Sequence, residues 1–330
     1  MKRTLGKSNI EVSALGMGCW AIGGPWWYVG EDGTETPSPA GWGQIDDKDS
    51  IRALHTAFDL GINFYDTADV YGCGHSEVVL GQAFADRRDK VVIATKFGKQ
   101  FDETKKHYYG HKTSPELIRQ ACDDSLRRLG IDYIDLYQFH WGDYDGDAAM
   151  VQEILEELVS VGKIRYYGWS TDIFENAEAW VGGEHYVSVQ HALHAAHAPS
   201  FNPTPIIELC KTENLAGITR GPLAMGILTG KFTTETTFAA DDIRNDWDFK
   251  QEGLNNMLKK LEDIRAILTS NGRTLAQGAL GWLWARSPMT IPIPGFKNIK
   301  QVEENAGALD YGPLTSEQLE EIDKILGRNQ

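Results

Sequence analysis

The chain of 330 residues contains only four cysteines. Cys19, Cys73, Cys122 and Cys210 are far apart and form no C-x-x-C pair, which excludes a disulfide framework and a cysteine-based zinc site of ordinary spacing. The segment 1–7 leads into no apolar stretch of the kind found in a secretion signal. We therefore expect reduced thiols and a cytoplasmic protein.

Basic residues are scarce relative to acidic ones. The 32 lysines and arginines face 47 aspartates and glutamates, which gives a formal net charge of -15. Such a chain has no basic excess with which to bind nucleic acid or an anionic lipid surface. Long apolar runs are also missing, since none approaches the roughly 18 residues of a membrane-spanning helix. We expect neither nucleic acid nor membrane as a partner, and nothing in the pattern indicates an oligomeric state.

No linker rich in proline, glycine or serine divides the chain, so we expect one domain over residues 1–330. Short apolar or β-branched runs alternate with helical patterns, as in parallel α/β proteins. Eight such units close a (β/α)8 TIM barrel, which usually takes about 250 residues and can exceed 400. The predicted strands are 13–18, 62–68, 91–96, 134–140, 164–170, 186–190, 216–220 and 289–294.

The helical patterns lie between these strands. Ser114 and Pro115 form a typical start for one helix, and Gly130 a typical stop. About 70 residues separate the last two strands, which predicts extra helices and a long loop at the carboxyl-terminal face of the barrel. The segment 30–43 reads as a second long loop, either roofing the substrate or forming a surface insertion. The predicted helices are 46–60, 77–84, 114–129, 150–161, 175–180, 205–213, 251–268 and 274–286.

Three short patterns fail to meet the requirements of other sites. The segment 16–21 fits the loosest dinucleotide fingerprint, but no helical pattern follows it. The segment 226–231 has three residues between its glycines, where a phosphate loop has four. His191, His194 and His197 recur at every third position without a nearby cysteine or carboxylate. We expect these histidines to pack within a loop, with a metal site as the alternative.

Reactive side chains stand at the ends of three neighbouring predicted strands. Asp66 and Tyr71 follow the second strand, Lys96 ends the third and His140 ends the fourth. Lys96 closes an apolar run, so its ammonium needs a partner at the barrel rim, and Asp66 can supply the opposite charge. Each of these residues taken alone fits a structural ion pair or a satisfied polar group.

Ordered motifs along the sequence resemble those of the aldo-keto reductase family, and the resemblance runs nearly from end to end. Three of them contain the four reactive residues: Asn63-Phe-Tyr-Asp66-Thr-Ala-Asp-Val-Tyr71-Gly, Ala94-Thr-Lys96 and Leu136-Tyr-Gln-Phe-His140-Trp. The resemblance continues through Gly168-Trp-Ser170, Gln190, the segment 221–231, Ile293-Pro-Gly295-Phe-Lys297 and the segment 301–306.

The resemblance implies reduction of a carbonyl by a nicotinamide cofactor, with catalysis by Asp66, Tyr71, Lys96 and His140. Hydride transfer to a carbonyl carbon leaves negative charge on oxygen, which must be protonated. Tyr71 can be the acid, but a phenol has a pKa near 10, so a nearby cation is needed to stabilise the phenolate. Lys96 would supply that charge, Asp66 would hold Lys96, and His140 would orient the carbonyl oxygen.

The resemblance also implies a set of cofactor contacts. Thr171 stands where the family usually has asparagine, and Arg220 where a ring usually stacks on nicotinamide. Arg220 fits either stacking or an anionic group of the substrate. Lys297 suits the 2′-phosphate of NADP (NADPH), so we expect NADP over NAD, with a solvated surface lysine as the alternative. The cofactor residues expected are Cys19, Trp20, Asp66, Ser170, Thr171, Gln190, Arg220, Gly221, Pro222, Leu223, Ala224, Gly226, Lys231, Gly295, Lys297, Gln301, Glu304 and Asn305.

Aromatic residues with hydrogen-bond donors are expected at the pocket mouth, a mixture that suits a sugar-like carbonyl substrate. Steroids and short aldehydes remain open, and some of these aromatic residues fit plain packing. Two other functions also remain: a binding subunit of the same fold with little turnover, and a hydrolase or lyase that uses Lys96 covalently. The expected substrate residues are Trp20, Trp27, Tyr108, Trp141 and Arg220.

Overall fold

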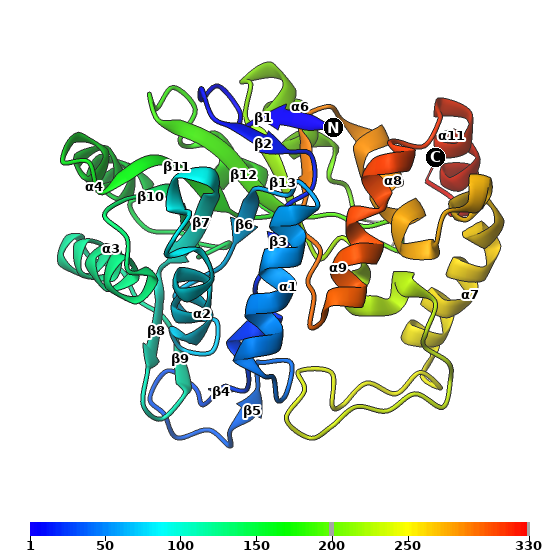
Figure 1. Cartoon of the computed structure of the whole chain (residues 1–330), viewed down its shortest axis with the longest axis horizontal. Helices are drawn as coiled ribbons and strands as arrows, with labels where there is room; N and C mark the ends of the chain where they lie inside the picture. The colour runs from blue at the N-terminus through cyan, green and yellow to red at the C-terminus, as the bar shows by residue number, and fades with distance from the viewer. Residues whose placement is uncertain (198–200, 329–330) are drawn as a thin grey trace.

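Eight parallel strands form the centre of the protein, whose computed structural model describes residues 1–197 and 201–328 (Figure 1). Amides of Gly16 and Gly18 donate to the carbonyls of Pro292 and Pro294 at 2.9 and 3.0 Å, which joins the first strand to the last. The predicted (β/α)8 TIM barrel is therefore confirmed. In order around the sheet, the strands are β3 (Met17–Gly18), β6 (Phe64–Asp66), β7 (Val92–Phe97), β10 (Ile134–Phe139), β11 (Ile164–Ser170), β12 (Tyr186–Ala192), β13 (Ala216–Arg220) and β14 (Thr290–Pro292).

Helices surround the barrel, and none of those described has the length and apolar character needed to cross a membrane. Ser114 caps its helix by accepting from the Leu117 amide at 3.3 Å, and Gly130 ends that helix at a φ of 65°. The helices are α1 (Asp47–Asp59), α2 (His75–Phe84), α3 (Pro115–Leu129), α4 (Ala148–Ser160), α5 (Phe174–Glu178), α6 (Thr204–Thr212), α7 (Glu252–Leu268), α8 (Leu275–Arg286), α9 (Ile299–Ala306), α10 (Ala308–Tyr311) and α11 (Ser316–Ile325), with short 3-10 turns at Ala21–Gly23, Arg88–Lys90, Ala224–Thr229 and Ser270–Gly272.

A hairpin that the sequence reading missed closes the amino-terminal end of the barrel. It consists of β1 (Lys2–Thr4) and β2 (Glu11–Ser13), so the predicted strand 13–18 is wrong at its start and only its last two residues form β3. The physical reason is burial. Leu5, Ile10 and Val12 pack into a cluster with inward side chains of the barrel strands, and each such side chain contributes about 1.5–3 kcal/mol when buried.

A second sheet lies at the carboxyl-terminal face, where the active site of such a barrel is built. Its strands are β5 (Ser38–Pro39), β4 (Trp27–Tyr28), β9 (His107–His111) and β8 (Lys99–Asp102).

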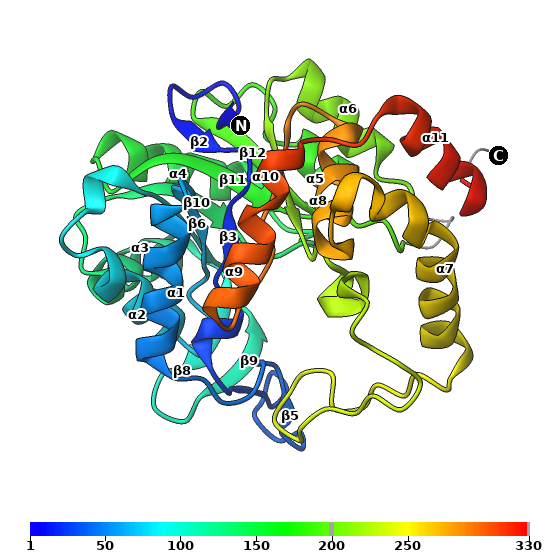
Figure 2. The same cartoon turned by 45° about the vertical axis from the view of Figure 1, so that its right-hand side comes forward.

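The predicted loop 30–43 is therefore not a free surface insertion. It contains β5, and it meets the long excursion between β13 and α7, where the Ile243 amide donates to the Gly41 carbonyl at 2.8 Å. Figure 2 shows this excursion reaching the neighbourhood of β5.

Candidate active site

The buried ammonium of Lys96 lies at the centre of the site. Its side chain ends strand β7 and is inaccessible to solvent. Nζ donates to Asp66 Oδ1 at 2.6 Å and to the Thr67 carbonyl at 2.7 Å. It also lies 3.4 Å from the hydroxyl of Tyr71. The structure thus brings together three of the four residues expected to be catalytic.

Two glutamine amides complete the surroundings of the Asp66 carboxylate. Its second oxygen, Oδ2, accepts from Gln138 at 2.9 Å and from Gln190 at 2.8 Å, and Gln190 donates further to Gln138 Oε1 at 3.1 Å. A buried carboxylate held by this many donors cannot turn away from Lys96 without losing several hydrogen bonds. Gln138 was missed in the sequence, although a polar residue inside the apolar strand Ile134–Phe139 is a signal that could have found it.

Aromatic neighbours fix the ring of Tyr71. Trp20 stacks on it with ring centroids 5.8 Å apart, and the indole N–H of Trp20 donates to the Ala40 carbonyl at 3.1 Å. His140 meets the same ring edge-on, with centroids 6.1 Å apart. Tyr71 is therefore held between the first and fourth strands of the barrel, with its hydroxyl toward Lys96.

The environment sets the protonation of these groups. Burial raises the pKa of Tyr71, while the charge of Lys96 opposes that rise. Burial lowers the pKa of Lys96, but the charges of Asp66 and Tyr71 and the hydrogen bonds to them together outweigh burial, so the net pKa of Lys96 is raised. Burial and the charge of Lys99 lower the pKa of His140 well below its usual value. At neutral pH the site therefore holds a protonated phenol, an ammonium ion and a neutral imidazole, whose Nδ1 is buried with no hydrogen-bond partner among the described residues.

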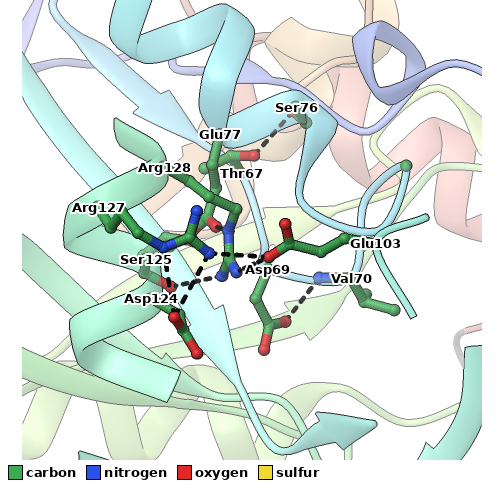
Figure 3. A network of polar contacts seen from close by, with 12 residues as sticks. Thr67, Asp69, Val70, Ser76, Glu77, Glu103, Asp124, Ser125, Arg127 and Arg128 are labelled. Carbon is green, nitrogen blue, oxygen red and sulfur yellow. Dashed lines mark hydrogen bonds and ion pairs between the residues drawn. The ribbon is translucent and has the colours of Figure 1, made fainter. Parts of the chain in front are cut away.

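A buried ion pair braces the loop that carries Tyr71 (Figure 3). Arg128 Nε donates to Glu77 Oε2 at 2.6 Å, and the other oxygen of Glu77 accepts from Thr95, the residue before Lys96, at 2.6 Å. The side chain of Arg128 also packs on Gly74, where an added Cβ would lie 2.6 Å from Arg128 Cδ. Since Gly74 adopts a φ of 91°, this close approach requires glycine.

The residues expected near nicotinamide are gathered at the ends of β11 to β13, but two have partners of their own. The Thr171 hydroxyl donates to the Gly142 carbonyl at 2.6 Å and accepts from the Ile173 amide at 3.0 Å. Arg220 forms an ion pair with Asp172 instead of standing free to stack. Ser170 is buried at the end of β11, beside Gln190 in the strand register, and Gln190 keeps its side-chain oxygen available as an acceptor.

The segment expected to hold the pyrophosphate is an irregular turn at the rim. Gly221, Ala224, Met225 and Gly226 all have positive φ values, of 63°, 48°, 52° and 101°. Apart from Gly221 and its two chain neighbours, no atom of the described residues lies within 4 Å of the position that a Gly221 side chain would take, so a ligand can approach the backbone there. The turn therefore fits a phosphate group. Pro222 and Leu223 lie within the turn, and exposed Lys231 follows it.

The residues expected at the adenosine end surround the start of α9. Lys297 Nζ donates to the Trp42 carbonyl and lies 4.0 Å from Asp242 Oδ2. The Lys297 amide donates to Gln301 Oε1 at 2.7 Å, and Asn305 Nδ2 donates to the Gly295 carbonyl at 3.5 Å. Burial lowers the pKa of Lys297, and Asp242 partly opposes this. Glu304 is half-buried on the same helix.

Two residues that were not expected, Lys99 and His111, join the aromatic residues expected at the pocket mouth. Tyr108 packs against Trp26 and Tyr28, with ring centroids 5.8 and 5.3 Å apart. Trp141, which follows His140, stacks on His111 at 4.7 Å. Lys99 joins the group by donating to the Tyr108 hydroxyl at 3.2 Å and to His111 Nε2. Lys99 and His111 could not be identified from the sequence, because they belong to a hairpin of polar residues.

Two expected site residues turn elsewhere. The thiol of Cys19 is fully buried and faces the Met17 carbonyl at 3.7 Å, and its backbone amide and carbonyl are hydrogen-bonded to Asp66 and Ser76 at 2.8 Å, so the expected cofactor contact of Cys19 is not open in the structure. Trp27 alternates with Trp26 and Tyr28 along its strand and lines a separate hollow, together with Ile45, His75 and Lys106.

His194 and His197 pack together after β12, whereas His191 belongs to that strand, so the expectation that all three histidines lie in a loop is wrong for His191. His194 and His197 stack with centroids 3.6 Å apart, and burial lowers the pKa of His191 to about 4, of His194 to about 3 and of His197 to about 4. In the part of the chain that the structure describes, no group of three or more histidine, cysteine, aspartate or glutamate side chains is arranged to hold a metal ion. The four cysteines are free and buried, and the cytoplasmic location inferred from them stays a prediction.

The family model for the aldo/keto reductase family matches residues 14–327. The chain belongs to this family. It is 30% identical to the aldo-keto reductase YhdN of Bacillus subtilis, over 98% of this chain and 92% of that one. The aldo-keto reductase yakc [NADP(+)] of Schizosaccharomyces pombe is 31% identical, over 91% and 85% of the two chains. A solved glycerol dehydrogenase from Gluconobacter oxydans is 30% identical, with a TM-score of 0.82 over 99% of this chain and 95% of that one. The protein is accordingly an NAD(P)H-dependent oxidoreductase of the carbonyl-reducing type.

Proposed function

We propose that this aldo-keto reductase uses NADPH to reduce the carbonyl group of a small, sugar-like aldehyde or ketone, reversibly, with Tyr71 as the acid. One observation carries the proposal: a solvent-inaccessible ammonium, paired with Asp66, lies 3.4 Å from the Tyr71 hydroxyl. A positive charge at this distance favours the phenolate that remains after proton transfer. It therefore lowers the barrier to giving up the proton at the moment when the substrate needs it.

Each residue of the site has a distinct task in this scheme. When bound, the reduced nicotinamide supplies a hydride to the carbonyl carbon. Tyr71 gives its proton to the oxygen, which would otherwise carry the full negative charge. His140, neutral at working pH, donates a hydrogen bond to that oxygen and orients it. Asp66 keeps Lys96 charged and in place.

A covalent role for Lys96 is disfavoured by its surroundings. A lysine that attacks a carbonyl must lose its proton, and such lysines have lowered pKa values. Here the net pKa of Lys96 is raised, and its ammonium already donates to Asp66 and the Thr67 carbonyl. The amine is therefore protonated and hydrogen-bonded, which supports a role as a positive charge rather than as a nucleophile that forms a Schiff base.

The preference for NADPH is proposed from Lys297. Its ammonium stands beside α9, at the expected adenosine end, where a cation can meet a 2′-phosphate, and the name of the Schizosaccharomyces pombe relative includes NADP(+). We expect Lys297→Ala to raise the KM for NADPH about 10- to 100-fold, the worth of a charge-assisted hydrogen bond, and the KM for NADH far less. Lys300→Ala, exposed on the same helix, is the matched control. An unchanged ratio of the two KM values in the Lys297 variant would reject the assignment.

The substrate class is proposed from the composition of the pocket wall. Trp20, Tyr108 and Trp141 offer aromatic faces next to hydrogen-bond donors, a combination that suits a polyhydroxylated molecule. The related structure is titled a glycerol dehydrogenase, which supports polyols as the reduced product. Absorbance of NADPH should fall on addition of short aldoses or hydroxyaldehydes. Tight NADPH binding without turnover of any aldehyde or ketone would instead favour a binding subunit.

A further inference from the structure

Lys99 lies beside the reacting centre without belonging to the catalytic four. It is the first residue of β8, three positions after Lys96. The His140 amide donates to the Phe97 carbonyl at 2.8 Å, two residues before Lys99. The charge of Lys99 is the second contributor, after burial, to the lowered pKa of His140. Lys99 therefore lies close enough to His140 for its charge to act on that imidazole.

The partners of Lys99 are neutral. Its ammonium donates to the Tyr108 hydroxyl at 3.2 Å and to Nε2 of His111. Burial and the charge of Lys99 lower the pKa of His111 to about 4, and burial raises the pKa of Tyr108 to about 12. Within residues 1–197 and 201–328, no carboxylate oxygen lies within 4 Å of Lys99 Nζ. An ammonium has three donors, and these contacts use two of them.

An ammonium in this position is unfavourable for the protein alone. Burial is the main cause that lowers the pKa of Lys99 to about 8, which measures how poorly its charge is compensated. A side chain that only linked β8 to β9 would not need a charge, since a neutral side chain could form the same link. A charge that lacks its counter-ion beside the reacting centre marks a site for a ligand of opposite sign.

We propose that the substrate carries an anionic oxygen group, a carboxylate or a phosphate, which Lys99 binds with Tyr108 and His111 while the carbonyl is held at Tyr71 and His140. This inference rests on the proposed carbonyl reduction and narrows its substrate to a short aldehyde or ketone with a negative charge. The aldo-keto reductase would thus distinguish charged substrates from neutral ones of the same length.

The geometry places the anionic end close to the reacting end. His111 stacks on Trp141, the residue after His140, and the rings of Tyr71 and Tyr108 pack against one apolar cluster formed by Trp26, Ala68, Val70 and Cys73. The two ends of the substrate therefore lie on one wall, which suits a short molecule. The formal net charge of -15 repels anions at long range, so a local cation is needed to bind one.

Matched pairs of aldehydes test the proposal. Butanal and 4-oxobutanoate differ in one carboxylate, and glyceraldehyde and glyceraldehyde 3-phosphate differ in one phosphate. We expect the wild type to have a kcat/KM about 10- to 100-fold higher for the charged member of at least one pair, chiefly through KM. The pair that shows this preference indicates whether the anionic group of the substrate is a carboxylate or a phosphate. Lys99→Met should bring the ratio close to one, and Lys99→Arg should restore most of it.

The control removes a charge from the same hairpin. Lys105→Met alters the exposed turn between β8 and β9 and should keep the wild-type ratio. Turnover of neutral aldehydes without preference for either charged partner would overturn the anion site and leave carbonyl reduction standing. Equal losses for both members in Lys99→Met would also overturn it.

If no aldehyde is reduced, the proposed function fails, and the anion site must then be tested by binding alone. Calorimetric titration with butanoate and with butanamide, its neutral analogue, should show about tenfold tighter binding of butanoate to the wild type and equal binding to Lys99→Met. Absence of that difference, with propyl phosphate and its neutral analogue propanol giving none either, would reject the anion site whatever the turnover.

The preference for charged substrates should fall as the pH rises through about 8. Lys99 loses its proton in this range, since burial lowers its pKa to about 8. Burial raises the pKa of Asp69 to about 8, so this neighbour gains negative charge over the same interval. Among the described residues, the other charged or titratable groups that contact or act on Lys99 are Tyr108, His111, His140, Asp143 and Arg220, and Glu103, Lys112, Asp124 and Arg128 line the same hollow. The ratio for a matched pair, measured between pH 6 and 9.5, should decline about tenfold; a constant ratio would contradict the role of Lys99.

Discussion

Replacing Tyr71 by phenylalanine should lower kcat about 10²- to 10⁴-fold, the range that a positioned general acid contributes. The ring would keep its stacking on Trp20 and its edge contact with His140, so only the transferable proton is lost. Lys96 and Asp66 would remain paired at 2.6 Å. NADPH binding, followed by fluorescence, should therefore stay close to the wild-type value while carbonyl reduction nearly stops.

Tyr166→Phe provides the comparison. This substitution also removes one phenolic hydroxyl, which in the wild type donates to Asn9 Oδ1 at 3.1 Å near the amino-terminal end of the barrel. Its kcat should match the wild type. If Tyr71→Phe retained full activity under the same conditions, the acid would have to be another group, and the scheme built on Lys96 would fail.

The barrel could be predicted from the sequence because its strands are continuous apolar runs. Strands β7, β10 and β12 contain almost entirely buried residues, and this uninterrupted pattern is typical of a sheet covered on both faces. The two hairpins were missed for the opposite reason. The strand β1 has three residues, and β8 and β9 are half-buried and polar, so neither shows the alternation that predicts a strand.

The catalytic group was predictable because its members stand at strand ends, and carboxyl ends of parallel strands gather at one face. The side-chain amides of Gln138 and Gln190 could not be predicted, because their position next to Asp66 depends on the register of the strands, which cannot be read from the sequence. Gln138 lies opposite Lys96 in the pairing of β10 with β7, and Gln190 lies opposite Ser170 in the pairing of β12 with β11. Likewise, only the folded structure shows that Arg220 pairs with Asp172 and that no carboxylate among the described residues pairs with Lys99.

The buried pair of Arg128 and Glu77 links α3 to α2, the helix that directly follows the loop carrying Tyr71. Arg128→Met should reduce the free energy of unfolding by about 3–5 kcal/mol, because the carboxylate of Glu77 would remain buried with Thr95 as its one remaining hydrogen-bond donor. The midpoint of urea unfolding should fall accordingly. The same variant should also lower kcat, because Arg128 packs directly on Gly74.

Arg127, the residue before Arg128, provides a control that separates the loss of a buried ion pair from the loss of a positive charge alone. Arg127 is 59% exposed, against 4% for Arg128, although both contact Glu103. Arg127→Met should therefore unfold at nearly the wild-type urea concentration. Replacing both partners, as in Arg128→Met with Glu77→Leu, removes the uncompensated carboxylate and should recover part of the lost stability. If the single Arg128 variant were as stable as the wild type, the pair would not brace the loop, and the position of Tyr71 would have to depend on Trp20 and His140 instead.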